Sequence, residues 1–200
     1  MNYTGPKAKV SRRLGIAISP KAEKYLERRP TPPGMHGKSR RPKKQSDYGR
    51  QLLEKQRLRF QYNVSERQLR NYYAKATRKT GNPADILLQS LECRLDAMVL
   101  RAGFARSIHA ARQLVGHGHI EVNGRKVNVP SFSCRENDVI RVREKSRQID
   151  AIGYALQSAS FPPYLNVDAE GMSATLNSIP KADDIPVICE ISLVVEFYSR

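Results

Sequence analysis

The positive charge of this 200-residue chain is concentrated in its first part, which limits both how the chain folds and what it binds. Residues 1–90 contain 22 Lys and Arg against 6 Asp and Glu, whereas residues 151–200 contain 2 against 6. Concentrated like charges repel one another, and a polyanion removes that repulsion while releasing its own counterions. The asymmetry therefore predicts a nucleic-acid partner in preference to a solubilising tail.

Length and composition fit one large domain or two small ones with a modest core. Apolar residues make up 40% of the chain, and Trp is absent. No run reaches the roughly 20 apolar residues that span a bilayer, and the basic start lacks the apolar stretch of a secretory signal. A membrane-surface protein would need a basic amphipathic helix, for which residues 1–45 contain too many prolines. We therefore expect no membrane partner.

The three cysteines, Cys93, Cys134 and Cys189, lie far apart in the sequence. An odd number at wide spacing argues against a disulfide framework and does not match the spacing of zinc ligands. We expect small buried thiols in a reducing compartment, and we expect no metal and no cofactor.

Basic pairs and prolines alternate through residues 1–45. Few apolar residues are available to order this segment, and Pro interrupts helices. We expect a basic extended arm that is largely disordered alone and folds against its target. A plain linker would not explain residues 31–37 (TPPGMHG), which are stiff at one end and freely bending at the other.

Helical signals begin after the arm. Ser46 or Asp47 can cap a first helix, and Ser65 with Gln68 has the spacing of a capping box for a second. A third helix begins at the pair Asn82-Pro83, carries an apolar stripe from Leu87 to Met98 and ends near Ala102-Gly103.

The next segment combines a short helix with a small sheet. Ser107 can cap a helix that Gly118 ends, and the Asn123-Gly124 pair between alternating residues is a strong signal for a type I′ hairpin. Residues 137–142 supply another turn and strand.

Beyond this sheet the periodicity is less decisive. Residues 146–158 have a helical pattern, and residues 164–167 and 172–176 have the pattern of strands. Residues 187–198 are apolar enough for a buried strand or a helix, and periodicity alone does not decide between them.

The short helix and the hairpin can together form a phosphate site. The amides that Ser107 leaves free at the helix N-terminus attract a phosphate, and Arg106 and Arg112 are near enough in sequence to neutralise it. The hairpin turn would place Asn123 and Arg125 beside the same groove. Such a site reads backbone shape more than base sequence, which suits folded RNA.

Residues 103–107 (GFARS), 111–115 (ARQLV) and 118–124 (GHIEVNG) resemble an RNA-binding module. It is shared by small-subunit ribosomal protein four, a family of pseudouridine synthases and bacterial tyrosyl-tRNA synthetases. Matches to the ribosomal family extend over the whole chain and include residues 32–37 (PPGMHG), 54–59 (EKQRLR), 64–69 (VSERQL) and 196–200 (EFYSR). The chain is identified as a member of the bacterial or organellar form of that family.

The resemblance implies an α+β fold with an inserted domain. A helical domain would comprise residues 46–90, completed by residues 180–200, and residues 91–179 would form the insertion. The RNA-binding module would occupy about residues 92–152 and pack helices on a small, mainly antiparallel sheet. The resemblance also implies that the terminal segment is helical and packs on the first domain.

The resemblance implies a structural role on the ribosome and no enzymatic activity or small-molecule substrate. The chain would bind small-subunit ribosomal RNA early, nucleate subunit assembly, contact ribosomal protein five, and influence decoding accuracy near the messenger RNA entry path. An RNA-modifying enzyme with the same module would need a further catalytic domain, for which too few residues remain; an RNA chaperone is another alternative. The location would be the cytoplasm, or an organellar ribosome.

Basic and polar side chains on these segments are the candidates for RNA contact. They are Arg12, Arg13, Arg28, Arg29, His36, Arg40, Arg41, Lys43, Lys44, Arg50, Lys55, Arg57, Arg59, Arg67, Arg70, Arg94, Arg106, Ser107, Arg112, His117, His119, Asn123 and Arg125. His117 and His119 alone make a poor metal site and are assigned to RNA instead. Asp96 is expected to orient Arg94.

Two features depart from the family. Many relatives carry an N-terminal cysteine cluster that binds a metal, but this chain has no cysteine before Cys93, so we expect no zinc. Ile108 and Gly116 stand where the family commonly has basic or polar residues, which removes two phosphate contacts that Arg106 and His109 would have to replace.

Aromatic residues in the helical region have two interpretations. Tyr48, Tyr62, Tyr72 and Tyr73 occur at helical spacing. They can stack on RNA bases, or they can form part of the core.

Overall fold

The computed structural model describes residues 3–38 and 45–200, and it describes only the backbone of His36 and Lys38. These residues form helices and one small antiparallel sheet, which confirms the α+β class. None of the helices that they form is long and apolar enough to cross a membrane.

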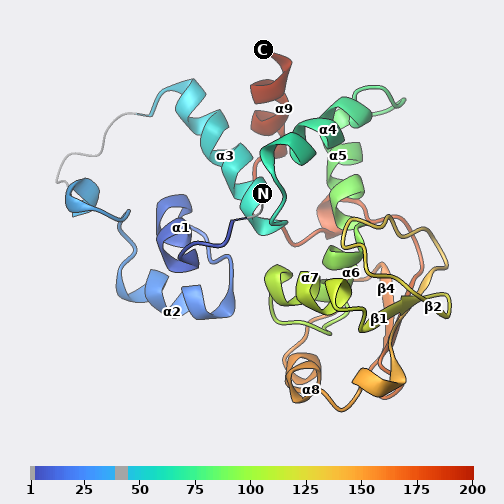
Figure 1. Ribbon diagram of the computed structural model, residues 1–200. Coiled ribbons are helices and arrows are strands. Elements are labelled where there is room, and N and C mark those ends of the chain that lie inside the picture. The colour runs from blue at the N-terminus through green and yellow to red at the C-terminus, as the bar shows by residue number, and fades with distance from the viewer. Residues whose placement is uncertain (1–2, 39–44) are drawn as a thin grey trace. The chain divides into compact units, whose positions relative to one another are not determined.

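The described chain divides into two compact units, one of which is built from two separate stretches of sequence (Figure 1). The first unit comprises the described residues up to Ala84 together with Val187–Arg200. The second comprises Asp85–Pro186.

The first unit begins with two helices, α1 (Lys7–Leu14) and α2 (Pro20–Arg28), followed by a 3₁₀ turn, η1 (Met35–Lys38). The expectation of an extended segment is therefore wrong over these helices. Gly15, in the left-handed region at φ 70°, ends α1, and Pro20 occupies the first helical position, where its missing N–H has no cost. A small apolar core of Val10, Leu14, Ile16, Ile18 and Phe60 orders α1 and the segment after it, and α2 packs against α1.

Three further helices complete this unit. They are α3 (Asp47–Gln61), α4 (Glu66–Ala76) and α9 (Ile191–Ser199). The side chain of Ser46 caps α3, and Ser65 with Gln68 forms the predicted capping box of α4. The terminal segment is helical, as the resemblance implies, and α9 packs along α3 and also contacts α4.

Hydrogen bonds with side chains of α3 also hold the backbone of the segment that precedes α9. The side-chain amide of Gln61 donates to the carbonyl oxygen of Ile188 at 3.1 Å and accepts from the backbone N–H of Ile188 at 3.1 Å. The backbone N–H of Glu190 donates to Glu54 Oε2 at 3.0 Å. The first unit is therefore joined across its two stretches of sequence.

The second unit begins within α5 (Pro83–Glu92), which is followed by α6 (Leu95–Arg101) and α7 (Ile108–Gly116). The single third helix expected from the apolar stripe is instead two helices. The interruption arises because Arg94 adopts extended backbone and forms an antiparallel bridge with Ser133.

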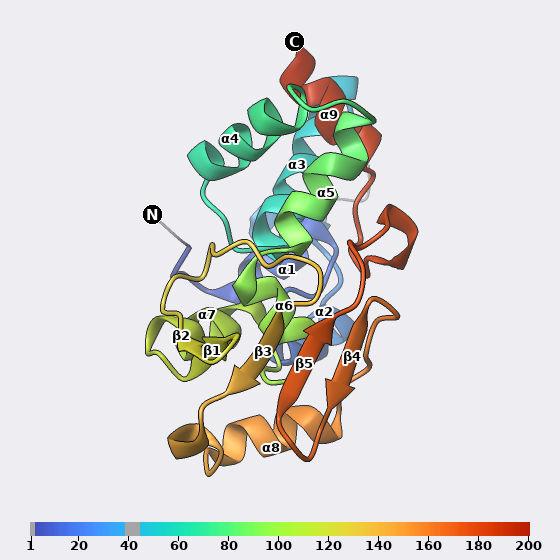
Figure 2. The same cartoon turned by 90° about the vertical axis from the view of Figure 1, so that its right-hand side faces the viewer.

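Five short strands form the sheet of the second unit, and all of their pairs are antiparallel in the order β2-β1-β3-β5-β4. Figure 2 shows β3, β5 and β4 side by side. The strands are β1 (Ile120–Val122), β2 (Arg125–Lys126), β3 (Val139–Val142), β4 (Leu165–Asp168) and β5 (Ser173–Leu176). Positive φ angles of 50° at Asn123 and 76° at Gly124 form the predicted hairpin turn between β1 and β2.

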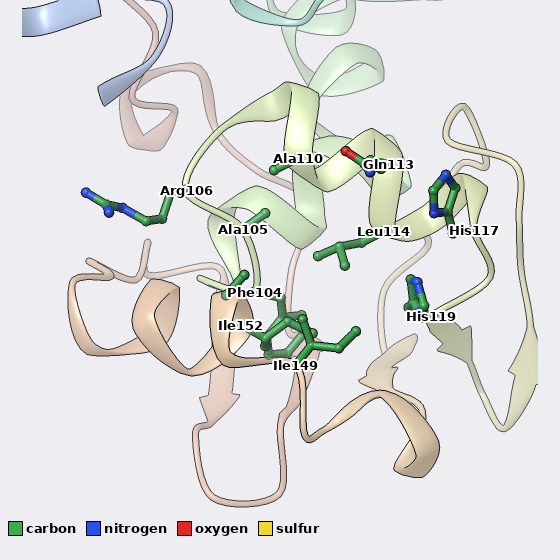
Figure 3. A pocket seen from close by; sticks show the side chains of 11 residues that line it. Phe104, Ala105, Arg106, Ala110, Gln113, Leu114, His117, His119, Ile149 and Ile152 are labelled. Atoms are coloured by element: carbon green, nitrogen blue, oxygen red, sulfur yellow. The ribbon is translucent and has the colours of Figure 1, made fainter. Parts of the chain in front are cut away.

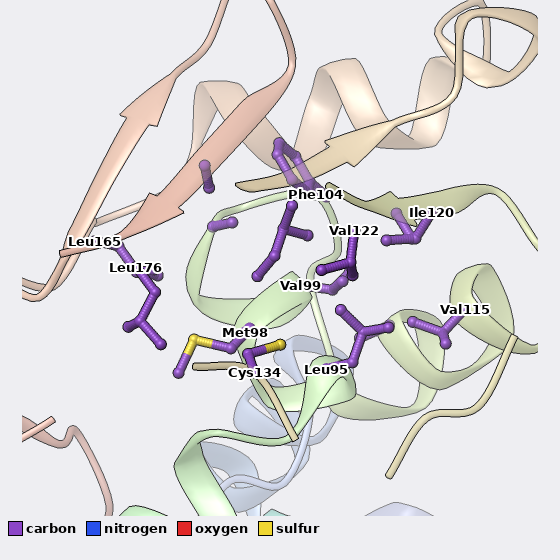
Figure 4. Packing of buried hydrophobic residues seen from close by; sticks show 14 of the residues in the cluster. Leu95, Met98, Val99, Phe104, Val115, Ile120, Val122, Cys134, Leu165 and Leu176 are labelled. Carbon is purple, nitrogen blue, oxygen red and sulfur yellow. The ribbon is translucent and has the colours of Figure 1, made fainter. Parts of the chain in front are cut away.

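Helices on both sides of this sequence complete the unit. The predicted helix near residue 150 is α8 (Asp150–Gln157), preceded by a 3₁₀ turn, η2 (Glu144–Ser146), and the unit ends near η3 (Ala182–Asp184). The core lies between the sheet and the helices α6 and α7 (Figure 4). Its labelled members include Met98, Val115 and Ile120.

Candidate nucleic-acid interface

One of the predicted RNA contacts, Arg94, lies in the interior of the second unit. Its side chain is 1% exposed, and its Nε and Nη2 donate to the two carboxylate oxygens of Asp96 at 2.9 and 2.6 Å. Asp96 Oδ2 also accepts from Arg112 Nη1 at 3.0 Å. The expectation that Asp96 orients Arg94 is confirmed. The assignment of Arg94 to RNA is wrong, because its guanidinium is enclosed and neutralised by Asp96.

A second predicted contact, Lys55, is also buried. Its Nζ donates to Glu66 Oε2 at 3.0 Å and lies 4.6 Å from the centre of the Phe197 ring. Lys55 therefore joins α3 to α4 and α9 within the first unit, and an external phosphate does not reach it. This assignment is corrected for the same reason.

Two other cations of α3 form internal contacts and are half-buried. Arg57 donates from Nε to the carbonyl oxygen of Leu14 at 2.9 Å and from Nη1 to Glu54 Oε1 at 2.6 Å. The Arg59 guanidinium lies 4.8 Å from the centre of the Phe60 ring. Arg50, by contrast, is exposed near the start of the helix, where it pairs with Asp47 at 2.7 Å.

Exposed cations gather on one face of α4 and just beyond its end. Arg67 and Arg70 are exposed, as are Lys75 within the helix and Arg78 just beyond it. Their spacing of three, five and three residues keeps them on one side of a helix, and Leu69 is buried on the opposite side. Lys75 and Arg78 were not among the predicted contacts, although the helical period that places Arg67 and Arg70 on one face places Lys75 there as well.

The basic pairs of the arm differ in their surroundings. Arg13, Arg28 and Arg29 are exposed, whereas Arg12 is half-buried and bonds to backbone carbonyls. The remaining candidates of the arm lie outside the described residues; they are the side chain of His36 and Arg40, Arg41, Lys43 and Lys44.

The N-terminus of α7 has the predicted cap. Ser107 Oγ accepts from the backbone N–H of Ala110 at 3.3 Å. Arg106 is exposed next to this cap, but Arg112 is turned toward Asp96, and its side chain is only 16% exposed. The structure therefore does not bring Arg106 and Arg112 together around one phosphate site.

The hairpin turn is fixed by the side chain of Asn123. Its Oδ1 accepts from the backbone N–H of Val139 at 2.9 Å, and its Nδ2 donates to Asp138 Oδ1 at 2.8 Å. These bonds connect the turn to the start of β3. The following strand, β2, lies at the edge of the sheet, and both of its residues, Arg125 and Lys126, are exposed cations.

A cavity of about 340 Å³ lies between α7 and α8 (Figure 3). Its walls are mostly apolar and include Leu114, Ile149 and Ile152, and the Arg106 side chain points away from it. The rings of His117 and His119 lie 6.0 Å apart at its side. Within the described parts of the chain, no group of three or more His, Cys, Asp or Glu side chains is placed to hold a metal ion.

The tyrosines of the helical region serve the core more than the surface. Tyr62 is 2% exposed, and Tyr73 stacks on Tyr198 with ring centres 5.1 Å apart. Tyr72 is half-buried. Tyr48 is 51% exposed and is the one of these four that presents most of its ring to solvent.

The match to a family model shows that the chain contains an S4 domain. Residues 93–140 match the S4 domain family, and residues 2–92 match the family described as the ribosomal protein S4/S9 N-terminal domain. A protein of Streptomyces avermitilis is 51% identical over 204 residues, which covers 100% of this chain and 99% of that protein. A protein of Micrococcus luteus is 52% identical over 196 residues, which covers 95% and 94% of the two chains.

A third relative, from Akkermansia muciniphila, is 49% identical over 201 residues, which covers 99% of this chain and 98% of that protein. All three relatives bear the name small ribosomal subunit protein uS4. The chain belongs to the uS4 family of small ribosomal subunit proteins. This family is structural and non-enzymatic.

Proposed function

We propose that this protein binds small-subunit ribosomal RNA directly through the exposed cations of both units. The observation that carries the proposal is the separation of the basic residues into two groups. Arg94 and Lys55 are buried and paired with carboxylates, whereas Arg67, Arg70 and Lys75 share an exposed face of α4. Cations kept exposed and together are available to neutralise phosphates and release counterions.

The proposal extends to assembly of the small subunit. Each unit presents preformed cationic segments, α4 in the first and β2 in the second, on a folded scaffold. RNA segments bound to the two units would be connected through one chain, which restricts how the remaining RNA folds. This supports a role as an early binder that nucleates assembly.

Finer roles are proposed from the family resemblance. The protein would contact ribosomal protein five, lie near the messenger RNA entry path and influence decoding accuracy. It would work on the ribosome in the cytoplasm. Cross-linking within assembled small subunits tests these contacts, and a reporter of misreading tests the influence on accuracy.

The central experiment is a titration of protein-free small-subunit ribosomal RNA with the purified full chain. Filter binding is measured at several salt concentrations, with an unrelated RNA of equal length as the control. We expect tight binding that weakens steeply with salt, with a log–log slope of about −0.7 to −0.9 for each phosphate contact. Equal binding to both RNAs, or binding that salt does not change, would contradict the proposal.

A further inference from the structure

The Arg12 guanidinium binds three backbone carbonyl oxygens at the end of α2. Its Nε lies 3.0 Å from the carbonyl oxygen of Arg29 and 3.0 Å from that of Thr31, and its Nη2 lies 3.4 Å from that of Pro32. Carbonyls at and beyond a helix C-terminus have no partner within the helix, and a basic side chain there satisfies them. The planar fork of an Arg side chain suits several acceptors at once.

The turn that Arg12 holds has little conformational freedom of its own. Pro32 and Pro33 restrict their φ angles, and Gly34 adopts a φ of 101° that other residues rarely reach. The backbone N–H of Gly37 donates to the carbonyl oxygen of Gly34 at 3.2 Å. A Cβ atom at Gly37 would clash with the Pro32 carbonyl oxygen, so only glycine permits this approach.

Three consecutive residues of α1 have different surroundings. Ser11 is fully buried, and its Oγ accepts from the backbone N–H of Ile18 at 3.1 Å. Arg12 is half-buried and holds the turn, whereas Arg13 is exposed. Arg12 and Arg13 are thus adjacent cations of the same type, of which Arg12 binds the backbone of residues 29–32 and Arg13 faces solvent.

The turn presents side chains that are open to solvent. Arg28 and Arg29 are exposed, and Met35 is 89% exposed. We propose that Arg12 is a positioning residue, which preforms residues 28–37 so that Arg28 and Arg29 meet RNA phosphates without first having to be ordered. Preforming a binding segment raises affinity because the entropy of ordering is no longer lost on binding. This inference rests on the proposed RNA-binding function.

The substitution that separates positioning from direct contact is Arg12→Lys. Lys supplies the same charge to a phosphate but lacks the planar fork that reaches three carbonyls. If the turn of the free Arg12→Lys protein adopts the RNA-binding conformation only about a tenth of the time, the apparent affinity for protein-free small-subunit ribosomal RNA falls about tenfold, because only that fraction can bind. Arg13→Lys is the matched comparison: it keeps the charge of an exposed cation that holds no described carbonyl, so its affinity should fall much less than that of Arg12→Lys. Unchanged affinity in Arg12→Lys would overturn the inference.

A double-mutant cycle tests whether Arg12 acts through its neighbours. In a chain that carries Arg28→Gln and Arg29→Gln, adding Arg12→Lys should have little further effect on RNA affinity. Additive losses would show that Arg12 is an independent RNA contact and would overturn the inference.

Amide hydrogen exchange tests the inference in the free protein, without RNA. Amide hydrogen exchange of the free protein should accelerate in Arg12→Lys over residues 29–37 and stay unchanged in α3 and α4. Gly37→Ala, which removes no charge, should accelerate the same amides, whereas Gly153→Ala in α8, where an added Cβ meets nothing within 4 Å, should not. Unchanged exchange in both turn variants overturns the inference, whereas failure of the unaltered chain to bind RNA overturns only the proposed function.

Discussion

The Tyr198 hydroxyl in α9 donates a hydrogen bond to Glu66 Oε1 at 2.8 Å, while Lys55 in α3 donates to the other oxygen of the same carboxylate. Glu66 is the first residue of α4, so one carboxylate joins three helices of the first unit. Its helix-terminal position also favours negative charge. The stability of this unit therefore depends on the ionisation of Glu66.

Stability of the first unit should fall in acid, and Glu66 should account for part of the fall. Burial raises the pKa of Glu66, but hydrogen bonds from Lys55 and Tyr198 and the charges of Lys55 and Arg59 outweigh it, so the pKa lies below its usual value. The stabilisation is complete above the unfolded-state pKa of about 4.3 and is lost as pH falls through the lowered folded-state pKa. Urea unfolding followed by circular dichroism between pH 3 and 7 should show a shallower acid loss in Glu66→Gln. An unaltered slope would contradict this.

Removal of Asp96 should strongly destabilise the second unit. The substitution Asp96→Ala leaves the Arg94 guanidinium charged and enclosed, which costs about 3–5 kcal/mol of unfolding free energy. Arg112→Gln should cost less, because Arg112 retains partial access to water. Equilibrium urea unfolding measures both values, and a loss below about 1 kcal/mol in Asp96→Ala would show that Arg94 finds another partner.

Neutralising the exposed face of α4 should weaken RNA binding without unfolding the helix. We expect Gln at Arg67, Arg70, Lys75 and Arg78 together to reduce the log–log salt slope by about 3 units, since each phosphate contact contributes about 0.7 to 0.9. Helicity should be retained, because these side chains do not enter the core. Lys181→Gln, which removes one exposed cation of the second unit, should lower the slope by one contact at most and so gives the scale of a single charge. An unchanged slope in the fourfold variant would exclude α4 from the interface.

The cysteine thiols should resist modification in the folded protein. Burial, together with the negative charge of Asp138 and the neighbouring Cys93 and Asp96, raises the pKa of the Cys134 thiol to about 12. Burial and Glu54 likewise raise the pKa of Cys189. Since the thiolate is the reactive form, a disulfide reagent at pH 8 should react slowly with the native chain and rapidly with all three thiols in urea. Fast reaction of the native protein would contradict the observed burial.

Local signals predicted most elements of the fold, because their causes lie within a few residues of one another. The Ser65–Gln68 capping box and the Asn123-Gly124 turn are of this kind. The helix α1 was not predicted, because its core includes Phe60, which is distant in sequence, and α2 was not predicted because it packs on α1. The break between α5 and α6 was not predicted, because it depends on a backbone bridge between Arg94 and Ser133, which is distant in sequence.

The candidate interface was predicted as a set of cations, and sequence does not show which of them are enclosed. Arg94 and Lys55 look like other basic residues until Asp96, Glu66 and Phe197 are placed around them. The cationic face of α4 is different, because helical periodicity alone identifies it. Exposure of a charge is a tertiary property, whereas its position around a helix is a local one.

The helices α3 and α4 are synthesised first, and the whole of Asp85–Pro186 follows them. The segment Val187–Arg200, which packs on α3 and α4, is synthesised last. During synthesis the sheet-containing unit therefore has all its residues while α3 still lacks the helix that covers it. We expect the sheet-containing unit to fold before the helical unit is complete. A chain whose residues 187–200 are replaced by an arrest sequence, long enough to hold residue 186 outside the exit tunnel, should show a protease-resistant sheet unit and a protease-sensitive α3.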